Sequence, residues 1–465
     1  MEKIEAKKKS VQRAILVVAL VTNFSNTFAA SALNIAIPNI GTEYQASATS
    51  VSWIVLAFLL ASALLAIPFG RIADIYGRIP IMKIGILLFC VAALLNAFSP
   101  NMPVFLLFRV MQGVGAAMVF ATNTAILVDA YPAEKRGSVM GIAVAAVFTG
   151  SALGPVIGGF LTHTFGWRSI FLLITAFALI ALFTAMLNLP NERFSRAKEK
   201  VNTSSIFLFV FSLGLFMYGL ATLMQNLQSY LIFAAGVVLI VILVKHEIKT
   251  EVPVIEVRLF KNRDFTFSNL AALFNFAAVF AVIFLMSIYL QLARGFNADY
   301  AGLIMISQPA VQAVLSPITG KMSDKRSPAV IASIGMGCCA AALVMFAFLD
   351  EQTPTLYIIA GLLLTGIGVA FFSSPNSNMI MGSVENKDYG VAASVMSTSR
   401  MVGQVIGMAF LTIIINAVIG NVPIADVPPA SIVQNMQITF PIFAAICCVG
   451  ILFSLRRGKG ERIET

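Results

Sequence analysis

The chain of 465 residues is 59% hydrophobic and only 11% charged, with a mean hydropathy of +0.90. Soluble domains are about half apolar and about a quarter charged, so this composition argues against a disordered chain, a nucleic-acid-binding module and a soluble enzyme. The formal net charge is +10, from 31 Lys and Arg against 21 Asp and Glu. The positions of these basic residues decide whether the charge indicates an acidic partner.

Fourteen apolar segments of about 20 residues or more follow one another along the chain. Each is long enough to cross roughly 30 Å of hydrocarbon as a helix that rises about 1.5 Å per residue. The sequence therefore predicts an all-α membrane protein with fourteen transmembrane helices. The segments are residues 14–37, 49–69, 80–98, 102–128, 136–162, 168–187, 204–223, 228–245, 265–292, 298–320, 328–348, 354–381, 389–419 and 435–456.

The basic residues follow the predicted topology. When the segments are joined alternately, 27 of the 31 Lys and Arg fall on one side of the membrane. The opposite loops hold Arg168 and Arg294, while Arg109 and Arg400 lie inside helices. Because cytoplasmic loops carry the excess of Lys and Arg, we expect a multi-pass protein of the cell membrane with both termini in the cytoplasm.

Glycine-anchored sequences recur in the two ends of the chain at a nearly constant offset. Residues 70–74 and 320–324 are 250 positions apart, and residues 113–115 and 366–368 are 253 apart. The offset of 253 is kept by the pairs Asn123 and Asn376, Gly137 and Gly390, Gly150 and Gly403, and Gly154 and Gly407. Such a repeat indicates two pseudo-symmetric six-helix bundles with a substrate site between them.

Two of the predicted helices have no counterpart in this repeat, which divides the chain into three parts. We expect a six-helix bundle in residues 1–190 and a second one in residues 264–465. Residues 191–263 would form a linker that carries the two additional transmembrane helices.

Three motifs connect the chain with a known family. Residues 70–78, GRIADIYGR, are similar to the signature between the second and third helices of the major facilitator superfamily. Residues 109–115, RVMQGVG, look like its helix 4 signature, and residues 150–159, GSALGPVIGG, like the helix 5 signature typical of exporters. The resemblance covers essentially the whole chain and points to the fourteen-helix drug:proton antiporter branch, which is multidrug-efflux-like.

The first motif places charged residues at a helix junction. Ion clusters there can hold one arrangement of helices and release it when the bundles move. By resemblance, the cytoplasmic gate comprises Gly70, Arg71, Asp74, Gly77 and Arg78, with Asp324 in the second half. The alternative is a solvated cluster that only fixes the topology.

The helix 5 motif carries Gly150, Gly154 and Gly158 at every fourth residue, followed by Gly159. These positions form a flat strip on one helix face, where a partner helix can approach closely. Pro155 weakens the hydrogen-bond ladder and permits a bend. Ordinary small-residue packing is the alternative to an exporter-specific role.

None of the 21 carboxylates is predicted to lie deep in a membrane helix. A proton-coupled exporter of cations normally needs such an acid, which titrates and attracts the cation. The related branch typically has an Asp in helix 1 shortly before an Asn-x-Ala-x-Pro sequence. Here Asn34-Ile-Ala-Ile-Pro38 is present, but the Asp position is Ala29. This departure favours neutral or anionic amphipathic substrates over cations.

Polar residues inside the predicted helices are candidates for substrate binding, because lipid cannot satisfy them. Arg400 lies roughly 16 Å into its helix. Ser397 and Gln404 share a helix face with it. The predicted substrate-binding residues are Asn26, Asn34, Gln308, Gln312, Ser397, Arg400 and Gln404. The Asn and Gln side chains could alternatively join helices, and Arg400 could bond to backbone carbonyls.

Arg109 is shallower, near the external end of its helix. By resemblance, Arg109 and Gln112 belong to the proton-relay region. We expect His163 and His246, near opposite membrane faces, not to be ligands, with His163 as a proton acceptor as the alternative.

These observations predict an exporter of small amphipathic compounds that works by alternating access, with proton antiport implied by the resemblance. One alternative is uptake or facilitated diffusion of a small solute. A polytopic membrane enzyme or sensor is disfavoured, because two isolated His leave little for a nucleophile–base pair. The expected partners are a small-molecule substrate, the lipid bilayer and protons, with no metal, cofactor or nucleic acid and no required oligomer.

Overall fold

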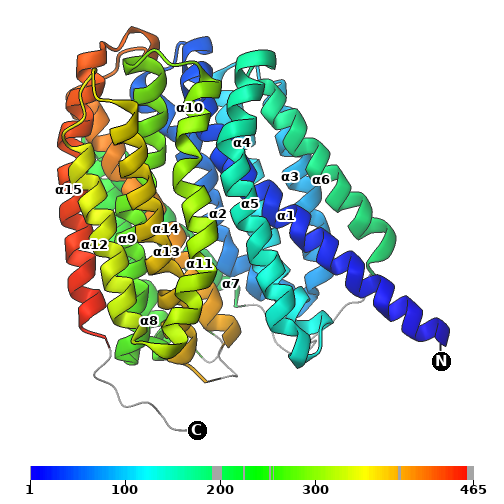
Figure 1. Cartoon of the computed structure of the whole chain (residues 1–465). Helices are drawn as coiled ribbons and strands as arrows, with labels where there is room; N and C mark the ends of the chain where they lie inside the picture. The colour runs from blue at the N-terminus through cyan, green and yellow to red at the C-terminus, as the bar shows by residue number, and fades with distance from the viewer. Residues whose placement is uncertain are drawn as a thin grey trace.

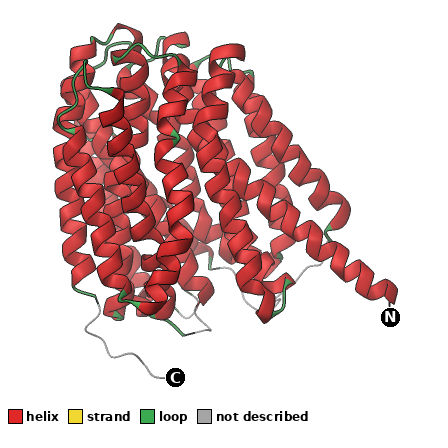
Figure 2. Cartoon of the chain, in the orientation of Figure 1, coloured by secondary structure: helices red, strands yellow, loops and turns green. Residues whose placement is uncertain are grey.

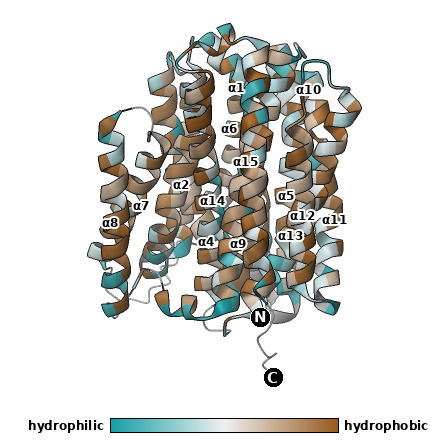
Figure 3. Ribbon diagram, turned by 90° about the vertical axis from the view of Figure 1, so that its left-hand side faces the viewer, coloured by the Kyte–Doolittle hydropathy of each residue, from teal (hydrophilic) through white to brown (hydrophobic). Residues whose placement is uncertain are grey.

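A computed structural model describes residues 2–190, 202–223, 226–250, 253–254, 256–385 and 389–457. Within this part of the chain, fourteen helical spans are long and apolar enough to cross a membrane. Helices dominate the drawing (Figure 2), and hydrophobic residues cover the middle of the helices while hydrophilic ones gather at the ends (Figure 3). The predicted fold class, with one span for each predicted segment, is confirmed.

The first six spans form one bundle. They are α1 (Glu2–Glu43), α2 (Ala48–Tyr76), α3 (Arg78–Ala97), α4 (Met102–Ala130), α5 (Ala133–Phe165) and α6 (Arg168–Asn188). α1 packs along α5 and α6, α2 and α3 pack on α4, and α3 also contacts α6. Helices α2 and α3 are separated by Gly77 alone, whose φ of 107° favours glycine.

The last six spans form the second bundle. They are α9 (Arg263–Ile288) with the π-helical turn η2 (Tyr289–Ala293), α10 (Ala298–Met305) and α11 (Ser307–Lys325) together as one span, α12 (Pro328–Phe346), α13 (Thr355–Gly382), α14 (Tyr389–Val418) and α15 (Pro429–Leu455). α9 packs on α14 and α15, α11 and α12 pack on α13, and α12 contacts α15. These pairings repeat those of the first bundle element by element, as the sequence repeat predicts.

Two spans lie outside the repeat. α7 (Thr203–Ala221) and α8 (Leu227–Lys249) form a hairpin, and α7 contacts α2 and α14. Gly219 of α7 lies against the backbone of Phe233. Close approach of this kind is how membrane helices gain packing contacts without a hydrophobic driving force. Short 3-10 turns, η1 (Val257–Lys261) and η4 (Ile424–Asp426), complete the elements.

Several helices extend beyond the predicted apolar segments, and one predicted segment is divided. α1 begins at Glu2 rather than near residue 14, and α15 begins at Pro429 rather than near residue 435. Hydropathy marks the apolar stretch, while the helix continues into polar flanks. The segment predicted as one helix over 298–320 is divided into α10 and α11 at Ile306.

α1 starts and α15 ends at the same end of the molecule (Figure 1), which we call the termini side. The other end, where α1 is joined to α2 and α14 to α15, is called the opposite side. The bundles meet mainly through α5 against α10 and α11, and through α2 against α14.

Candidate transport path and its gates

Arg400 of α14 is a charged residue far from both ends of its helix in the second bundle. It lies eleven residues after the first residue of α14, or roughly 16 Å along the helix. Its Cζ atom lies 4.9 Å from the ring centre of Phe276 on α9, and the side chain is exposed. Among the described residues, Arg400 makes no hydrogen bond to a backbone carbonyl. The structure therefore does not show the alternative in which Arg400 binds carbonyls of a neighbouring helix.

Ser397 and Gln404 lie on the same helix as Arg400 and are half-buried. Their spacing of three and four residues from Arg400 puts all three side chains on one helix face. An arginine over an aromatic ring remains free to bind through its edge, since the ring contacts only the guanidinium face. The face of α14 that carries Arg400 can therefore present hydrogen-bond donors to an anionic or polar group.

The remaining candidates on α1 and α11 are more enclosed. Asn34 is buried, and its amide donates to the Ala30 carbonyl at 2.8 Å. Gln308 is buried against α13, where its backbone carbonyl lies directly against Gly366. The Gln308 Oε1 atom has no hydrogen-bond partner among the described residues. Gln312, one turn further on, is half-buried.

Asn26 lies inside the first bundle. It borders a cavity of about 10 Å³ inside the first bundle, whose walls are Thr22, Ser25, Asn26, Ile86, Phe89, Val119 and Ala178. The cavity is enclosed by α1, α3, α4 and α6, and it is about the size of one water molecule. The amide of Asn26 donates to Thr22 of its own helix at 3.0 Å. The structure therefore places Asn26 in a bundle interior, away from the bundle interface.

Arg109 and Gln112 are brought together on α4. The Nη1 atom of Arg109 donates to Gln112 Oε1 at 2.6 Å, and its Nε donates to the Ile54 carbonyl of α2 at 3.1 Å. The guanidinium also stacks over Phe58, 4.6 Å from the ring centre. Both residues are buried, and Gln112 Nε2 has no partner among the described residues. A buried cation thus connects α4 to α2.

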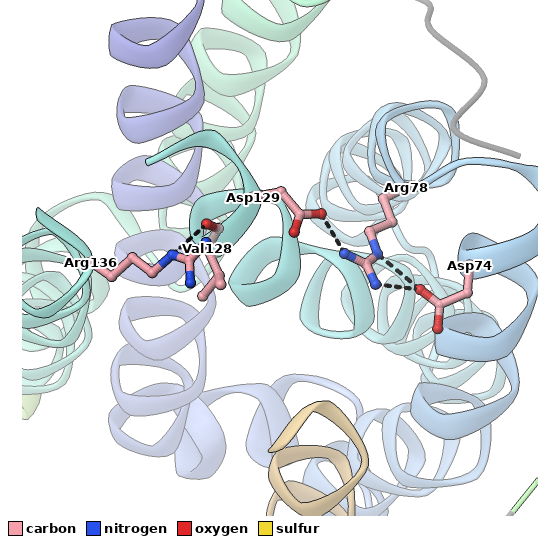
Figure 4. A network of polar contacts seen from close by, with 5 residues as sticks. All are labelled: Asp74, Arg78, Val128, Asp129 and Arg136. Atoms are coloured by element: carbon pink, nitrogen blue, oxygen red, sulfur yellow. Dashed lines mark hydrogen bonds and ion pairs between the residues drawn. The ribbon is translucent and has the colours of Figure 1, made fainter. Parts of the chain in front are cut away.

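Arg78 joins Asp74 to Asp129 in a charged network on the termini side (Figure 4). Arg78 donates to Asp74 Oδ1 through Nε at 2.9 Å and Nη2 at 2.6 Å, and to Asp129 Oδ2 through Nη1 at 2.6 Å. The network joins the end of α2, the start of α3 and the end of α4. Asp129 is not among the predicted gate residues, because it is 51 residues from Arg78 in the sequence and no motif connects the two.

The other predicted gate residues differ in their surroundings. Gly70 faces α4, where a Cβ added to this glycine would lie 3.9 Å from Ala121, so the position leaves room for a methyl group. Gly77 makes the one-residue junction between α2 and α3. Arg71 is half-buried in the last turns of α2. The side chain of Asp324 lies outside the described residues.

The glycines of α5 contact two different partners. A Cβ at Gly150, Gly154 or Gly158 would lie under 3.0 Å from atoms of α1, so these glycines let α1 approach closely. A Cβ at Gly159 would instead clash with the Ala298 carbonyl of α10, in the other bundle. The Pro155 carbonyl likewise lies against Gly302 of α10. The motif therefore serves both intra-bundle and inter-bundle contacts.

The bundles are joined at the opposite side by hydrogen bonds from several elements. Ser287 donates to the Asn34 carbonyl, and Gln291 donates to the Ile35 carbonyl at 2.8 Å. Between α2 and α14, the hydroxyls of Thr412 and Ser52 are 2.8 Å apart. Two backbone hydrogen bonds also join the loops: the N–H of Ala48 donates to the Val422 carbonyl, and the N–H of Ile424 donates to the Ala46 carbonyl. The interface is therefore closed at the opposite side.

Comparison with known proteins decides the family. The model of the Major Facilitator Superfamily matches residues 19–246 and 268–464. The chain belongs to the major facilitator superfamily. It is accordingly a secondary transporter and not an enzyme, which removes the alternative of a polytopic membrane enzyme.

Several curated proteins are similar to the chain over most of their length. A riboflavin transporter, RibZ, of Clostridioides difficile is 28% identical over 95% of this chain and 96% of its own. The methylenomycin A resistance protein of Bacillus subtilis is 27% identical over 89% and 90%. The multidrug resistance protein Stp of Mycobacterium tuberculosis is 28% identical over 82% and 71%.

A solved structure has the same fold. It is a bacterial homolog of the human lysosomal transporter Spinster in an inward-facing and occupied conformation, with a TM-score of 0.70. It is 15% identical, and the match covers 95% of both chains. At this identity the likeness shows the fold alone.

One basic residue of this superfamily member lies where the sequence does not predict it. Arg457 is one of the 27 basic residues predicted on the side of the termini, and its side chain is only 4% exposed. It donates to Asn376 Oδ1 and, at 3.4 Å, to the Ser268 hydroxyl. Burial lowers the pKa of the Arg457 guanidinium to about 9, which leaves it a cation at neutral pH. The sequence gives no signal for this burial, because Arg457 follows the last helix and its partners lie on α9 and α13.

Proposed function

We propose that this transporter exports small amphipathic compounds, neutral or anionic, by alternating access with proton antiport. The proposal places it in the fourteen-helix drug:proton antiporter branch. Support comes from the helix 5 motif and from similarity to a methylenomycin A resistance protein and a multidrug resistance protein. The division into residues 1–190, 191–263 and 264–465 is part of the same proposal.

The orientation follows from the positive charges. The predicted topology places 27 of 31 Lys and Arg on the side that carries both termini, so we assign the termini side to the cytoplasm. The opposite side, where the bundles are joined, then faces outward. In this conformation Arg400 would be reached from the cytoplasm, as an exporter requires for loading.

The observation that carries the substrate class is Arg400, exposed at mid-helix over Phe276. Burying a cation at this depth in the membrane is energetically unfavourable unless the cation faces a polar path. The guanidinium attracts anions and repels cations. The aromatic face beside it suits a flat apolar group. We assign Asn34, Gln308, Gln312, Ser397, Arg400 and Gln404 to the substrate path and leave Asn26 out, because it lies in a bundle interior.

Proton coupling is assigned to the region of Arg109 and Gln112. Their contact is buried and joins α4 to α2, which faces α14 across the bundle interface. A change in the hydrogen bonding of Arg109 can therefore reach the interface between the halves. Asp74, Arg78 and Asp129 are assigned to the cytoplasmic gate.

A second candidate is the transport of a single defined solute. Its support is the riboflavin transporter, which resembles this chain over nearly the full length of both proteins. Riboflavin is uncharged at neutral pH and carries a flat ring system, so it fits the same substrate class. A narrow substrate range would favour this candidate over multidrug export.

Transport by inside-out vesicles tests the proposal. A fluorescent anion, a neutral dye and a fluorescent cation are each followed with and without an acidic vesicle interior. We expect uptake of the anion and the neutral dye, stimulated by the pH gradient. Transport of the cation alone would refute the substrate class, and rates insensitive to collapse of the gradient would refute proton antiport.

A further inference from the structure

His163 and Asp299 form a contact between the two bundles that the proposed function does not use. His163 lies in the last turn of α5, and Asp299 in the first turn of α10. The Nδ1 atom of His163 is 3.4 Å from Asp299 Oδ2, and both side chains are about half exposed. The other carboxylate oxygen of Asp299 is buried and has no hydrogen-bond partner among the described residues. The Asp299 carboxylate is thus turned toward His163.

The contact lies beside a close backbone approach of the two bundles. The carbonyl of Ala298 lies against Gly159, and the carbonyl of Pro155 lies against Gly302. A Cβ at Gly302 would clash with the Pro155 oxygen, so α5 and α10 touch through their backbones. Any motion that opens the opposite side through this interface separates α5 from α10, and the distance between His163 and Asp299 grows with it.

His163 is accessible from the opposite side. A cavity of about 470 Å³ borders His163 and contains polar groups of α1 and of the connection after η2. Its walls are Pro38, Asn39, Thr42, Glu43, Thr162, His163, Gln291, Leu292, Gly295, Phe296, Asn297 and Ala298. Protons can therefore exchange between bulk water and the imidazole in the closed state.

The other charged groups near His163 have partners of their own. Glu43 of α1 accepts hydrogen bonds from Trp167, at 2.6 Å, and from Arg168 of α6. Arg294, in the connection after η2, donates to the Thr353 carbonyl. Tyr300 of α10 packs edge-on against Phe296. α4 also contacts α5, and on α4 the buried Arg109 binds Gln112. The charged residues of α11 lie at the end of that helix on the termini side.

We propose that His163 and Asp299 form a pH-dependent latch that stabilises the state closed at the opposite side. Histidine is the side chain whose charge ordinarily changes between pH 5 and 8. The attraction to Asp299 exists only when the imidazole is protonated, and it is strongest when α5 and α10 are together. By linkage, a proton then shifts the conformational equilibrium toward the closed state. That this proton comes from outside the cell rests on the orientation given under the proposed function.

The latch is tested by measuring the distance between the bundles rather than transport. Spin labels are attached to Phe98→Cys and Phe348→Cys, at equivalent sites on the opposite side of the two bundles, in the full chain with its five native cysteines replaced. Both positions are more than 70% exposed, at 71% and 73%. Distance distributions are recorded in nanodiscs without substrate at pH 5 and pH 8 for the reference protein, His163→Gln, Asp299→Asn and His163→Lys.

We expect the ratio of closed to open populations to rise about 1.4- to 5-fold from pH 8 to pH 5, the range for a half-exposed ion pair. His163→Gln and Asp299→Asn should abolish this change, and His163→Lys should favour the closed state at both pH values. The control His246→Gln removes the only other histidine and should keep the change. A pH response that survives His163→Gln, or no response in the reference protein, would overturn the latch. Because no substrate or gradient is present, the result is independent of whether export and antiport are correct.

Discussion

Arg78 holds Asp74 through two hydrogen bonds, of 2.6 and 2.9 Å, across the one-residue junction between α2 and α3. The same guanidinium reaches Asp129 at the end of α4. The cluster therefore fixes three helix ends of the first bundle relative to one another. In a transporter whose bundles must move, such a cluster can act on the equilibrium between conformations.

We predict that Asp74→Asn reduces transport far more than stability. The ion pair is partly exposed, so its loss should lower the free energy of unfolding by less than about 1 kcal/mol. If the cluster shifts the conformational equilibrium, transport should fall about fivefold or more. Initial rates in proteoliposomes and thermal unfolding measure the two effects. The control Asp350→Asn, at an exposed site of the opposite side, should leave the rate unchanged. Normal transport by Asp74→Asn would contradict a gating role.

The glycines of α5 offer a matched comparison within one helix. Gly158→Ala would place a Cβ 2.8 Å from both Cα and Cβ of Ala32, which should cost about 1–3 kcal/mol by overpacking and reduce transport. Gly141→Ala meets nothing within 4 Å, so it should be neutral or stabilise by up to about 1 kcal/mol. Melting temperatures of the two variants measure the difference. Equal behaviour would show that α1 and α5 are not in contact in the functional protein.

Arg109→Lys is predicted to uncouple transport from the pH gradient. Lysine keeps the charge but cannot reach the Ile54 carbonyl and Gln112 with one planar group. We expect similar rates with and without an imposed gradient, whereas the unsubstituted protein is stimulated. Size-exclusion chromatography checks that the variant is folded. An unchanged stimulation factor would place the coupling elsewhere.

Arg457→Gln tests the unexpected burial of the last basic residue in the described chain. Without the guanidinium, Asn376 Oδ1 loses its charged donor, and we expect a loss of about 1–3 kcal/mol in the free energy of unfolding. Arg456→Gln, at the neighbouring exposed position, is the control and should have little effect. Equal melting temperatures for both variants would mean that Arg457 is solvated.

The number and order of the helices follow from the sequence because bilayer thickness fixes the length of an apolar span. The repeat likewise predicts which helices correspond, as the matching contacts of α1 with α5 and of α9 with α14 show. The extension of α1 to Glu2 and the division at Ile306 were not predicted. These features depend on helix propensity and packing outside the hydropathy signal.

Contacts between residues of one helix could be predicted from the sequence, but contacts between different helices could not. Arg109 and Gln112 are three residues apart, a spacing that puts them on one face. Arg400 and Phe276 lie on separate helices, and nothing in the sequence singles out Phe276 among 37 Phe. Asn26 lies in a bundle interior, and the sequence pattern cannot distinguish that position from a bundle interface.

The most direct test of the account is the substrate selectivity of Arg400 variants. Arg400→Ala, Arg400→Lys and the exposed-site control Arg326→Ala are compared in inside-out vesicles for one fluorescent anion and one neutral dye. Because the guanidinium is assigned as the counter-charge, Arg400→Ala should lose anion transport by about tenfold, equivalent to about 1.4 kcal/mol, while it keeps transport of the neutral dye. Arg400→Lys should recover part of the anion rate, and Arg326→Ala should match the unsubstituted protein. Equal anion rates for Arg400→Ala and the unsubstituted protein would contradict a substrate path built around Arg400.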